Sequence, residues 1–215
     1  MNKITLYAFP GSCSKVSLIL LEEANADFTL ELVQLKRGEH KQAAYRKINP
    51  KSKVPTLVVD GVTITENPAI ISYLAYLFPE AKLLPTTESK VQQLQYLSDL
   101  CFCSATLHPM VTRICKPEFF VEAQSIPSVK HKASEAMDES FNLIEEHLSR
   151  CPWWHGDNWS AMDAYIHWVF TRVETCKYDV DRFQNFVAHS NRMKLRPAVQ
   201  RAMAKESLML KQIQQ

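Results

Sequence analysis

The sequence lacks several patterns, and each absence excludes a class of protein. No apolar run approaches the ~20 residues of a membrane span, and the first residues enter a strand-like alternation without an apolar signal segment. The 25 basic and 23 acidic residues are scattered along the chain, giving a net charge of +2 and no basic stripe for nucleic acid. We therefore expect a cytoplasmic protein that binds neither a membrane nor nucleic acid.

Cysteine is present, but without the spacing of a metal or redox motif. Cys101 and Cys103 are the only close pair among six cysteines, and they do not fit a Cys-x-x-Cys pattern. In a chain of this size without a signal segment we expect all six to be reduced thiols, with this pair in a helix as core or interface residues. We expect no metal site.

The 215 residues, 46% of them hydrophobic, suit two domains with a buried core in each. Residues 1–79 follow the order βαβαββα, with Asp60-Gly61 as the signal for a tight hairpin turn. One βαβ unit followed by a hairpin predicts a small mixed sheet with helices on both faces, a thioredoxin-like arrangement. Residues 80–88 form a linker, and helical periodicity through residue 210 predicts an all-helical domain over residues 89–215. The predicted fold class is α/β plus all-α, with a C-terminal helical bundle domain.

Two turns in the first domain have the features of a ligand site. Pro55 opens an apolar run and lacks the N–H of an interior strand residue, so it belongs in a tight turn before the strand, where a cis bond is the natural expectation. Such a turn exposes the backbone of Val54 to a ligand. Glu66 and Asn67 lie where the next strand ends and a helix begins, which brings an acidic side chain to free backbone N–H groups. The two turns predict a site for a peptide-like ligand.

The turn from the first strand to the first helix, Pro10-Gly11-Ser12-Cys13-Ser14, offers small nucleophilic side chains at a helix N-terminus. The positive end of that helix favours a thiolate, either on Cys13 or on a thiol ligand hydrogen-bonded to Ser12 or Ser14. Ordinary capping by serine explains the same residues without a function. In the loop that contains His40, an imidazole and a neighbouring ammonium group are suited to hold a carboxylate, although a solvated loop is the usual case.

Taken together, the motifs resemble the cytosolic glutathione transferase family over nearly the whole chain. The order and spacing of the motifs make the resemblance specific, and the turn before the first helix is most similar to that of the bacterial beta class. The motifs are Pro10-Gly11-Ser12-Cys13-Ser14, Asn49-Pro50, Lys53-Val54-Pro55, Thr65-Glu66-Asn67, a Ser160-x-x-Asp163 capping box and Leu195-Arg196-Pro197-Ala198-Val199-Gln200.

The resemblance implies that glutathione binds in the first domain as co-substrate. Its cysteinyl backbone would pair with the main chain at Val54-Pro55, and its γ-glutamyl end would meet Glu66 and Asn67. Asn67 stands where most family members have serine, and its amide is able to bind a carboxylate. His40 and Lys53 would hold the glycyl carboxylate.

The resemblance also implies that the site lowers the pKa of the glutathione thiol, because the thiolate is the nucleophilic form. Cys13 is the first choice for the catalytic residue and Ser12 and Ser14 come next, while Tyr7 in the first strand is the tyrosine-type alternative. An ionised Cys13 would instead form a mixed disulfide with glutathione, which favours thiol exchange over conjugation.

The helical domain would supply the pocket for a hydrophobic electrophile. Phe9, His108 and Arg113 are the residues assigned to it. Beta-class members place a histidine near position 108 followed by a lysine, where this chain has Pro109. The resemblance further implies a homodimer, with contacts from residues 89–105 and from the helix after Pro68.

Two other functions remain open. The Ser12-Cys13-Ser14 turn is also similar to that of zeta-class maleylacetoacetate isomerases, although those have arginines where this chain has Lys15-Val16-Ser17. A non-catalytic binding or regulatory protein with the same fold is the third reading. Such proteins typically lose the glutathione contacts, whereas Val54-Pro55 and Glu66-Asn67 are present here.

Overall fold

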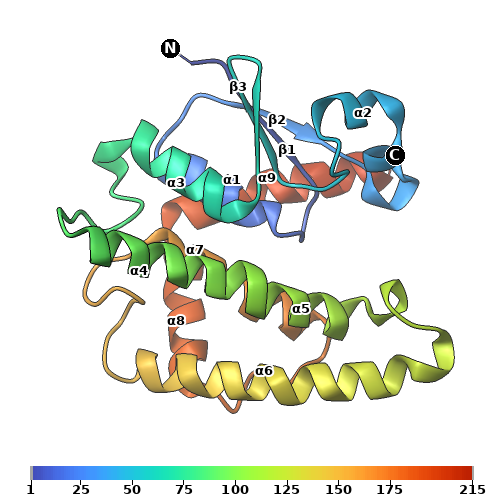
Figure 1. Cartoon of the computed structure of the whole chain (residues 1–215), viewed down its shortest axis with the longest axis vertical. Helices are drawn as coiled ribbons and strands as arrows, with labels where there is room; N and C mark the ends of the chain where they lie inside the picture. The colour runs from blue at the N-terminus through green and yellow to red at the C-terminus, as the bar shows by residue number, and fades with distance from the viewer. Residues whose placement is uncertain (1, 215) are drawn as a thin grey trace. The chain divides into compact units, whose positions relative to one another are not determined.

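The computed structural model describes residues 2–214, and the chain divides into two compact units (Figure 1). The first unit contains the residues up to Leu84 together with those from Leu195 onward, and the second is Pro85–Lys194. The last helix therefore belongs with the N-terminal elements, whereas its helical periodicity led us to group it within residues 89–215. Helical periodicity marks where helices begin, but it does not specify the unit against which a helix packs.

A four-stranded sheet in the order β2-β1-β3-β4 forms the centre of the first unit. Strand β1 is parallel to β2 and antiparallel to β3, and β3 is antiparallel to β4. This mixed sheet confirms the predicted thioredoxin-like arrangement. The strands are β1 (Ile4–Ala8), β2 (Thr29–Leu32), β3 (Thr56–Val59) and β4 (Val62–Thr65).

Helices cover both faces of this sheet, as predicted. Leu6 of β1 is fully buried on the face beside the first helix, and Tyr7 points to the other face, where its ring meets Tyr45 edge-on at 5.9 Å between centroids. The helices of this unit are α1 (Ser14–Glu23), α2 (Ala43–Ile48), α3 (Asn67–Leu77) and α9 (Pro197–Gln214). Tyr45 lies in α2, while α1 packs against α3 and α9.

The two turns flanking β3 have the predicted backbone conformations. The Val54–Pro55 peptide bond is cis, which confirms the expectation for a proline that opens a strand. Asp60 and Gly61 both have positive φ angles, 49° and 85°, between the antiparallel strands β3 and β4. This is the conformation of a two-residue hairpin turn of the type that an Asp-Gly pair favours.

The second unit is helical. Its helices are α4 (Lys90–Cys101), α5 (His108–Cys115), α6 (Ile126–Leu148), α7 (Ala161–Thr175) and α8 (Gln184–Leu195), with a π-helical segment, Phe102–Leu107, between α4 and α5. Short 3₁₀ turns occur at Leu35–Arg37, Glu39–Lys41, Pro79–Ala81, Pro117–Phe119 and Ala123–Ser125. In residues 2–214, each helix is too short or too polar to cross a membrane.

The predicted capping box at the start of α7 is confirmed. Asp163 is fully buried and accepts hydrogen bonds from the backbone N–H and the hydroxyl of Ser160 at 2.9 and 3.1 Å. Its other oxygen accepts from the backbone N–H of Trp154 at 2.8 Å and from His189 Nε2 at 2.9 Å. One carboxylate therefore joins the start of α7 to the preceding loop and to α8.

A disulfide bond corrects the expectation that all six cysteines are reduced. Cys115 at the end of α5 is bonded to Cys176 just after α7, with 5.3 Å between their Cα atoms. The expectation was wrong for this pair because it rested on the size of the chain and the lack of a signal segment, neither of which shows that folding brings two cysteines 61 residues apart into contact. Cys101 and Cys103 are free thiols, exposed and buried respectively.

Candidate active site

The turn between β1 and α1 is held by its own serines. Ser12 Oγ donates to the carbonyl oxygen of Phe9 at 2.7 Å, and Ser14 Oγ accepts from the backbone N–H of Phe9 at 3.1 Å. The two hydroxyl oxygens are 2.7 Å apart. Ser14 is only 1% exposed, whereas Ser12 and Phe9 are half-buried. Of the two hydroxyls, that of Ser12 is therefore the more accessible.

Cys13 is buried as a protonated thiol. It is 8% exposed, and its Sγ donates to the carbonyl oxygen of Val54 at 3.4 Å. Burial raises the pKa of Cys13 to about 12, Glu66 adds to the increase, and the opposing effects of the backbone and of Lys53 are smaller. In this environment Cys13 is a hydrogen-bond donor at neutral pH rather than the thiolate that the helix terminus alone favours.

The loop before the cis proline is fixed from α2. The hydroxyl of Tyr45 donates to the carbonyl oxygen of Lys53 at 2.7 Å, and Nδ2 of the fully buried Asn49 donates to the same oxygen at 2.9 Å. Both side chains also bond the hydroxyl of Thr56, each at 2.8 Å. Sequence reasoning did not find Tyr45, because nothing near it in the sequence indicates that its hydroxyl binds the loop before the cis proline.

Asn67 and Glu66 have different environments at the start of α3. Asn67 is 4% exposed, and its Nδ2 donates to the carbonyl oxygen of Cys13 at 3.0 Å while its Oδ1 accepts from Ser17 Oγ at 2.9 Å. The amide is thus engaged with α1. Glu66 adopts a positive φ of 70°, and its exposed carboxylate accepts from Lys51 Nζ at 2.9 Å.

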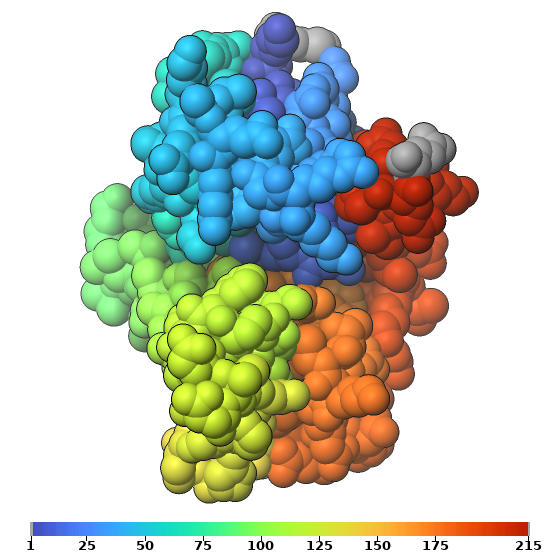
Figure 2. All heavy atoms as spheres, turned by 90° about the vertical axis from the view of Figure 1, so that its right-hand side faces the viewer, coloured from blue at the N-terminus to red at the C-terminus, as the bar shows by residue number. Residues whose placement is uncertain are grey.

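His40 lies in a strongly basic segment. Residues 36–53 contain a single acid, Glu39, and seven basic residues: Lys36, Arg37, Lys41, Arg46, Lys47, Lys51 and Lys53. Burial, aided by Lys41 and Lys53, lowers the pKa of His40, so its ring is neutral at neutral pH. Within residues 2–214 its buried Nδ1 has no hydrogen-bond partner. Figure 2 shows α2 and its neighbours, in light blue, on the surface of this unit.

The other two predicted site residues belong to the helical unit. His108 begins α5, where its Nδ1 lies 3.4 Å from the Tyr165 hydroxyl and its ring meets Trp168 edge-on at 4.7 Å. Arg113 stacks on the ring of Phe120 at 5.1 Å. Arg113 also lines a cavity of about 390 Å³ between α5 and α6, together with Met110, Val129, Lys132, Ala133 and Ala136.

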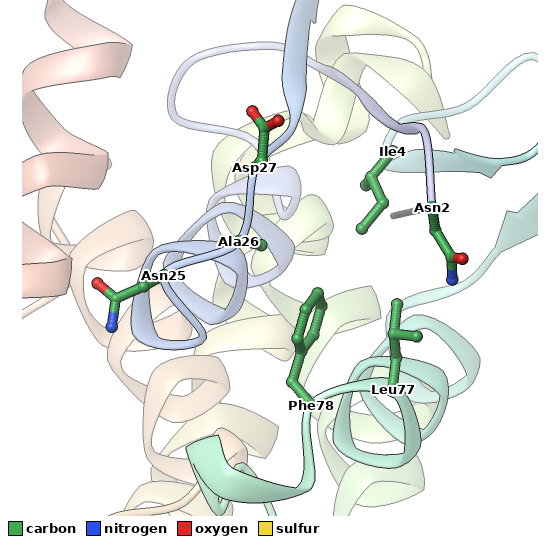
Figure 3. Close-up of a pocket in the computed structure, with 7 residues that line it drawn as sticks. All are labelled: Asn2, Ile4, Asn25, Ala26, Asp27, Leu77 and Phe78. Atoms are coloured by element: carbon green, nitrogen blue, oxygen red, sulfur yellow. The ribbon is translucent and has the colours of Figure 1, made fainter.

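Another cavity, of about 420 Å³, opens in the first unit near the beginning of β1 (Figure 3). It is lined by Asn2, Ile4, Asn25, Ala26, Asp27, Leu77 and Phe78. None of the residues predicted for the peptide-like ligand lines it. This cavity is therefore distinct from the site that Cys13, Val54 and Asn67 form.

Comparison with known proteins identifies the family. Residues 2–76 match the model for the "Glutathione S-transferase, N-terminal domain". Glutathione S-transferase GstA of Escherichia coli O157:H7 is 31% identical over 205 residues, which cover 94% of this chain and 98% of that protein. The chain belongs to the glutathione transferase family.

Solved structures agree with this assignment. A sphingomonad glutathione S-transferase complexed with glutathione is 29% identical, with a TM-score of 0.84, covering 95% of this chain and 99% of that one. The bacterial beta class glutathione S-transferase of Sphingomonas chungbukensis is 27% identical with the same TM-score and coverage. The similarity to bacterial and beta-class transferases that the motifs predicted is thereby confirmed.

One contact of the turn between β1 and α1 comes from an unexpected part of the chain. Glu206 in α9 is 7% exposed, and its Oε1 accepts from the backbone N–H of Gly11 at 2.8 Å. Its Oε2 pairs with Lys15 Nζ at 2.8 Å. Since 195 residues separate Glu206 from Gly11, no local pattern in the sequence signals this contact.

Proposed function

We propose that the protein is a glutathione transferase that activates the thiol of glutathione for attack on small hydrophobic electrophiles. The observation that carries the proposal is the convergence of three segments of the first unit at Cys13. Its thiol donates to Val54 beside the cis proline, and its carbonyl accepts from Asn67 at the start of α3. Membership in the family and the similarity to a transferase complexed with glutathione support it.

In the proposed complex, each charged group of glutathione binds an oppositely charged group or a hydrogen-bond donor of the first unit. The γ-glutamyl ammonium binds the exposed carboxylate of Glu66 in place of Lys51. The adjoining carboxylate binds the backbone N–H groups at the start of α3, because the Asn67 amide is already engaged with α1. The glycyl carboxylate binds Lys53 and the neutral ring of His40, whose unpartnered nitrogen supports this role.

The basic segment around α2 supports an anionic ligand. Glutathione carries two carboxylates and one ammonium group, so it is an anion at neutral pH. Residues 36–53 contain seven Lys and Arg residues and one acid. This excess of positive charge attracts an anion from solution and raises its rate of association. The attraction is screened by salt.

We assign catalysis to hydrogen-bond donation toward the glutathione sulfur. The S–H of Cys13, turned from the carbonyl oxygen of Val54, and the hydroxyl of Ser12, turned from that of Phe9, would stabilise the thiolate of glutathione and lower its pKa. Ser14 is buried and holds the turn through Phe9. Burial also opposes ionisation of Cys13, so a mixed disulfide is disfavoured and conjugation is preferred to thiol exchange.

We assign the electrophile pocket in the helical unit to His108 and Arg113, and the part of Phe9 stays a prediction from the family resemblance. The aromatic contact of His108 with Trp168 and the apolar residues among those lining the cavity beside Arg113 support an apolar ligand for the helical unit. The proposed role in the cell is the detoxification of such electrophiles in the cytoplasm.

We further propose a homodimer. Val91, Leu94 and Leu97 of α4 are 67%, 64% and 42% exposed, and Tyr76 of α3 is 83% exposed. Large apolar side chains grouped in this way on a helix are typical of a surface that another subunit covers. Light scattering of the wild type and of Leu94→Glu tests the dimer, since a charge in the interface shifts the mass toward that of one chain.

Calorimetric titration with glutathione tests the proposed binding mode. Glu66→Gln removes the charge that pairs with the ammonium group, so we expect glutathione to bind about tenfold more weakly or worse. Glu31→Gln, at an exposed position of β2, is the matched control and should bind like the wild type. Absence of binding by the wild-type protein refutes the proposed function.

A further inference from the structure

The last helix carries a buried acid into the transferase site. The buried residues of α9 are Ala198, Val199, Ala202, Glu206 and Met209. Glu206 is the single charged residue among them. A carboxylate is rarely buried unless it is paired, and Glu206 has two partners in the turn region. Its oxygens lie 2.8 Å from Gly11 N and 2.8 Å from Lys15 Nζ.

These two partners flank the candidate catalytic residues. Gly11 precedes Ser12, and Lys15 follows Ser14, so one carboxylate spans the whole Ser12-Cys13-Ser14 segment from outside. Gly11 adopts a φ of +75°, a conformation that favours glycine and that the hydrogen bond to Glu206 holds in place. We propose that Glu206 is a positioning residue, which fixes the turn so that the Ser12 hydroxyl and the Cys13 thiol can turn from Phe9 and Val54 and donate to the glutathione sulfur.

Other contacts attach α9 to α1, so Glu206 is not needed for docking alone. Arg196 forms two hydrogen bonds with the carboxylate of Glu23, at 2.6 and 2.9 Å. Arg201 contacts the carboxylate and the carbonyl oxygen of Glu22 at 2.7 and 2.6 Å. Figure 1 shows α9, in red, beside α1, in blue. These pairs lie near the C-terminal end of α1, whereas Glu206 reaches its N-terminal end.

The ion pair with Lys15 matters for the chemistry. A lone carboxylate near the sulfur would oppose formation of the glutathione thiolate, because like charges repel. Lys15 neutralises the charge of Glu206, so the contacts of Glu206 with Gly11 and Lys15 restrain the turn without adding net charge. A positioning role and a purely electrostatic role therefore predict opposite changes when Glu206 is removed.

The test compares Glu206→Ala with Glu206→Gln, whose amide oxygen still accepts from Gly11 but which loses the ion pair. For Glu206→Ala we expect kcat for conjugation to fall about ten- to a hundredfold with a smaller change in the KM for glutathione, because misplaced donors weaken the transition state most. Glu206→Gln should retain activity to within about threefold. The apparent pKa of bound glutathione, from the ultraviolet absorbance of its thiolate, should rise in the alanine variant.

Two further measurements separate the possible outcomes. Amide hydrogen exchange at Gly11 in the free protein should become faster in Glu206→Ala. This measures the hydrogen bond between Gly11 and Glu206 whether or not glutathione binds. Arg201→Gln is the matched control on the same helix, and it should lower stability without changing kcat or the thiol pKa. The inference rests on the proposed function. If the wild type does not bind glutathione, that result refutes the proposed function, whereas the exchange rate at Gly11 still tests the contact with Glu206. Unchanged kcat in both Glu206 variants, or a lowered thiol pKa in Glu206→Ala, overturns the positioning role.

Discussion

Burial of Cys13 predicts that its thiol reacts slowly with alkylating agents at neutral pH. Because iodoacetamide reacts with the thiolate, its rate follows the ionised fraction and the access to the sulfur. With a pKa of about 12, roughly 10⁻⁵ of Cys13 is ionised at pH 7, whereas a thiol with the ordinary value of 9.0 is ionised to about one per cent. Alkylation of Cys13 should therefore be at least about a hundredfold slower than that of an ordinary exposed thiol.

Free N-acetylcysteine, a fully accessible thiol, serves as the reference, because the exposed Cys101 lies in the segment that we propose for the dimer contact. Mass spectrometry at successive times measures both rates in one sample, and the rates should become similar in denaturant. The rate at Cys13 should still rise with pH at pH 10, which distinguishes a raised pKa from poor access. If Cys13 reacts as fast as N-acetylcysteine at pH 7, with a rate that levels off above that pH, the argument from burial is refuted.

The same pKa shift predicts a pH dependence of stability. The pKa of Cys13 is higher in the folded chain, about 12, than its ordinary value of 9.0. Burial of the neutral thiol therefore stabilises the fold fully below pH 9, and this contribution is lost as the pH rises toward 12. Three units of pKa correspond to about 4 kcal/mol. The difference in unfolding free energy between wild type and Cys13→Ala should shrink over that range, and a constant difference would contradict the shift.

Three further predictions concern stability. Asn67→Ala should lower the free energy of unfolding by about 2–4 kcal/mol in urea, because it leaves Ser17 of α1 and the carbonyl oxygen of Cys13, just before α1, without these buried hydrogen bonds. A loss below about 0.5 kcal/mol would show that water replaces them. Replacing Cys115 and Cys176 by serine should cost about 4 kcal/mol from the entropy of a loop of 61 residues, and dithiothreitol should then have no effect on unfolding. Asp163→Ala should cost about 3–5 kcal/mol in the same assay, since it removes four hydrogen bonds and leaves His189 buried without its acid, and wild-type stability in this variant would refute that role.

Much of the first unit follows from local sequence. Pro55 lacks the N–H of a strand residue, Asp60-Gly61 is suited to positive φ angles, and Ser160 and Asp163 have the spacing of a capping box. Each of these features depends on residues within a few positions of one another. The corresponding structure is what the sequence predicts.

The features that sequence reasoning missed depend on contacts between distant residues. Glu206 reaches Gly11 across 195 positions, and Cys115 pairs with Cys176 across 61. Asn67 was expected to offer its amide to glutathione, but the fold brings that amide to the carbonyl of Cys13. The helix terminus favours a thiolate on Cys13, yet burial by surrounding segments reverses this preference. Such effects are set by packing, which no local spacing records.

The most direct test of the account measures two reactions with wild type and Cys13→Ser. One is the conjugation of glutathione to a chloronitrobenzene. The other is the reduction, by glutathione, of the mixed disulfide that glutathione forms with hydroxyethyl disulfide. We expect the wild type to favour conjugation. The conjugation rate of Cys13→Ser should stay within about tenfold of the wild-type rate, because a hydroxyl also donates a hydrogen bond to the thiolate. Dominant disulfide reduction that disappears in Cys13→Ser would contradict the account and make Cys13 a thiol-exchange nucleophile.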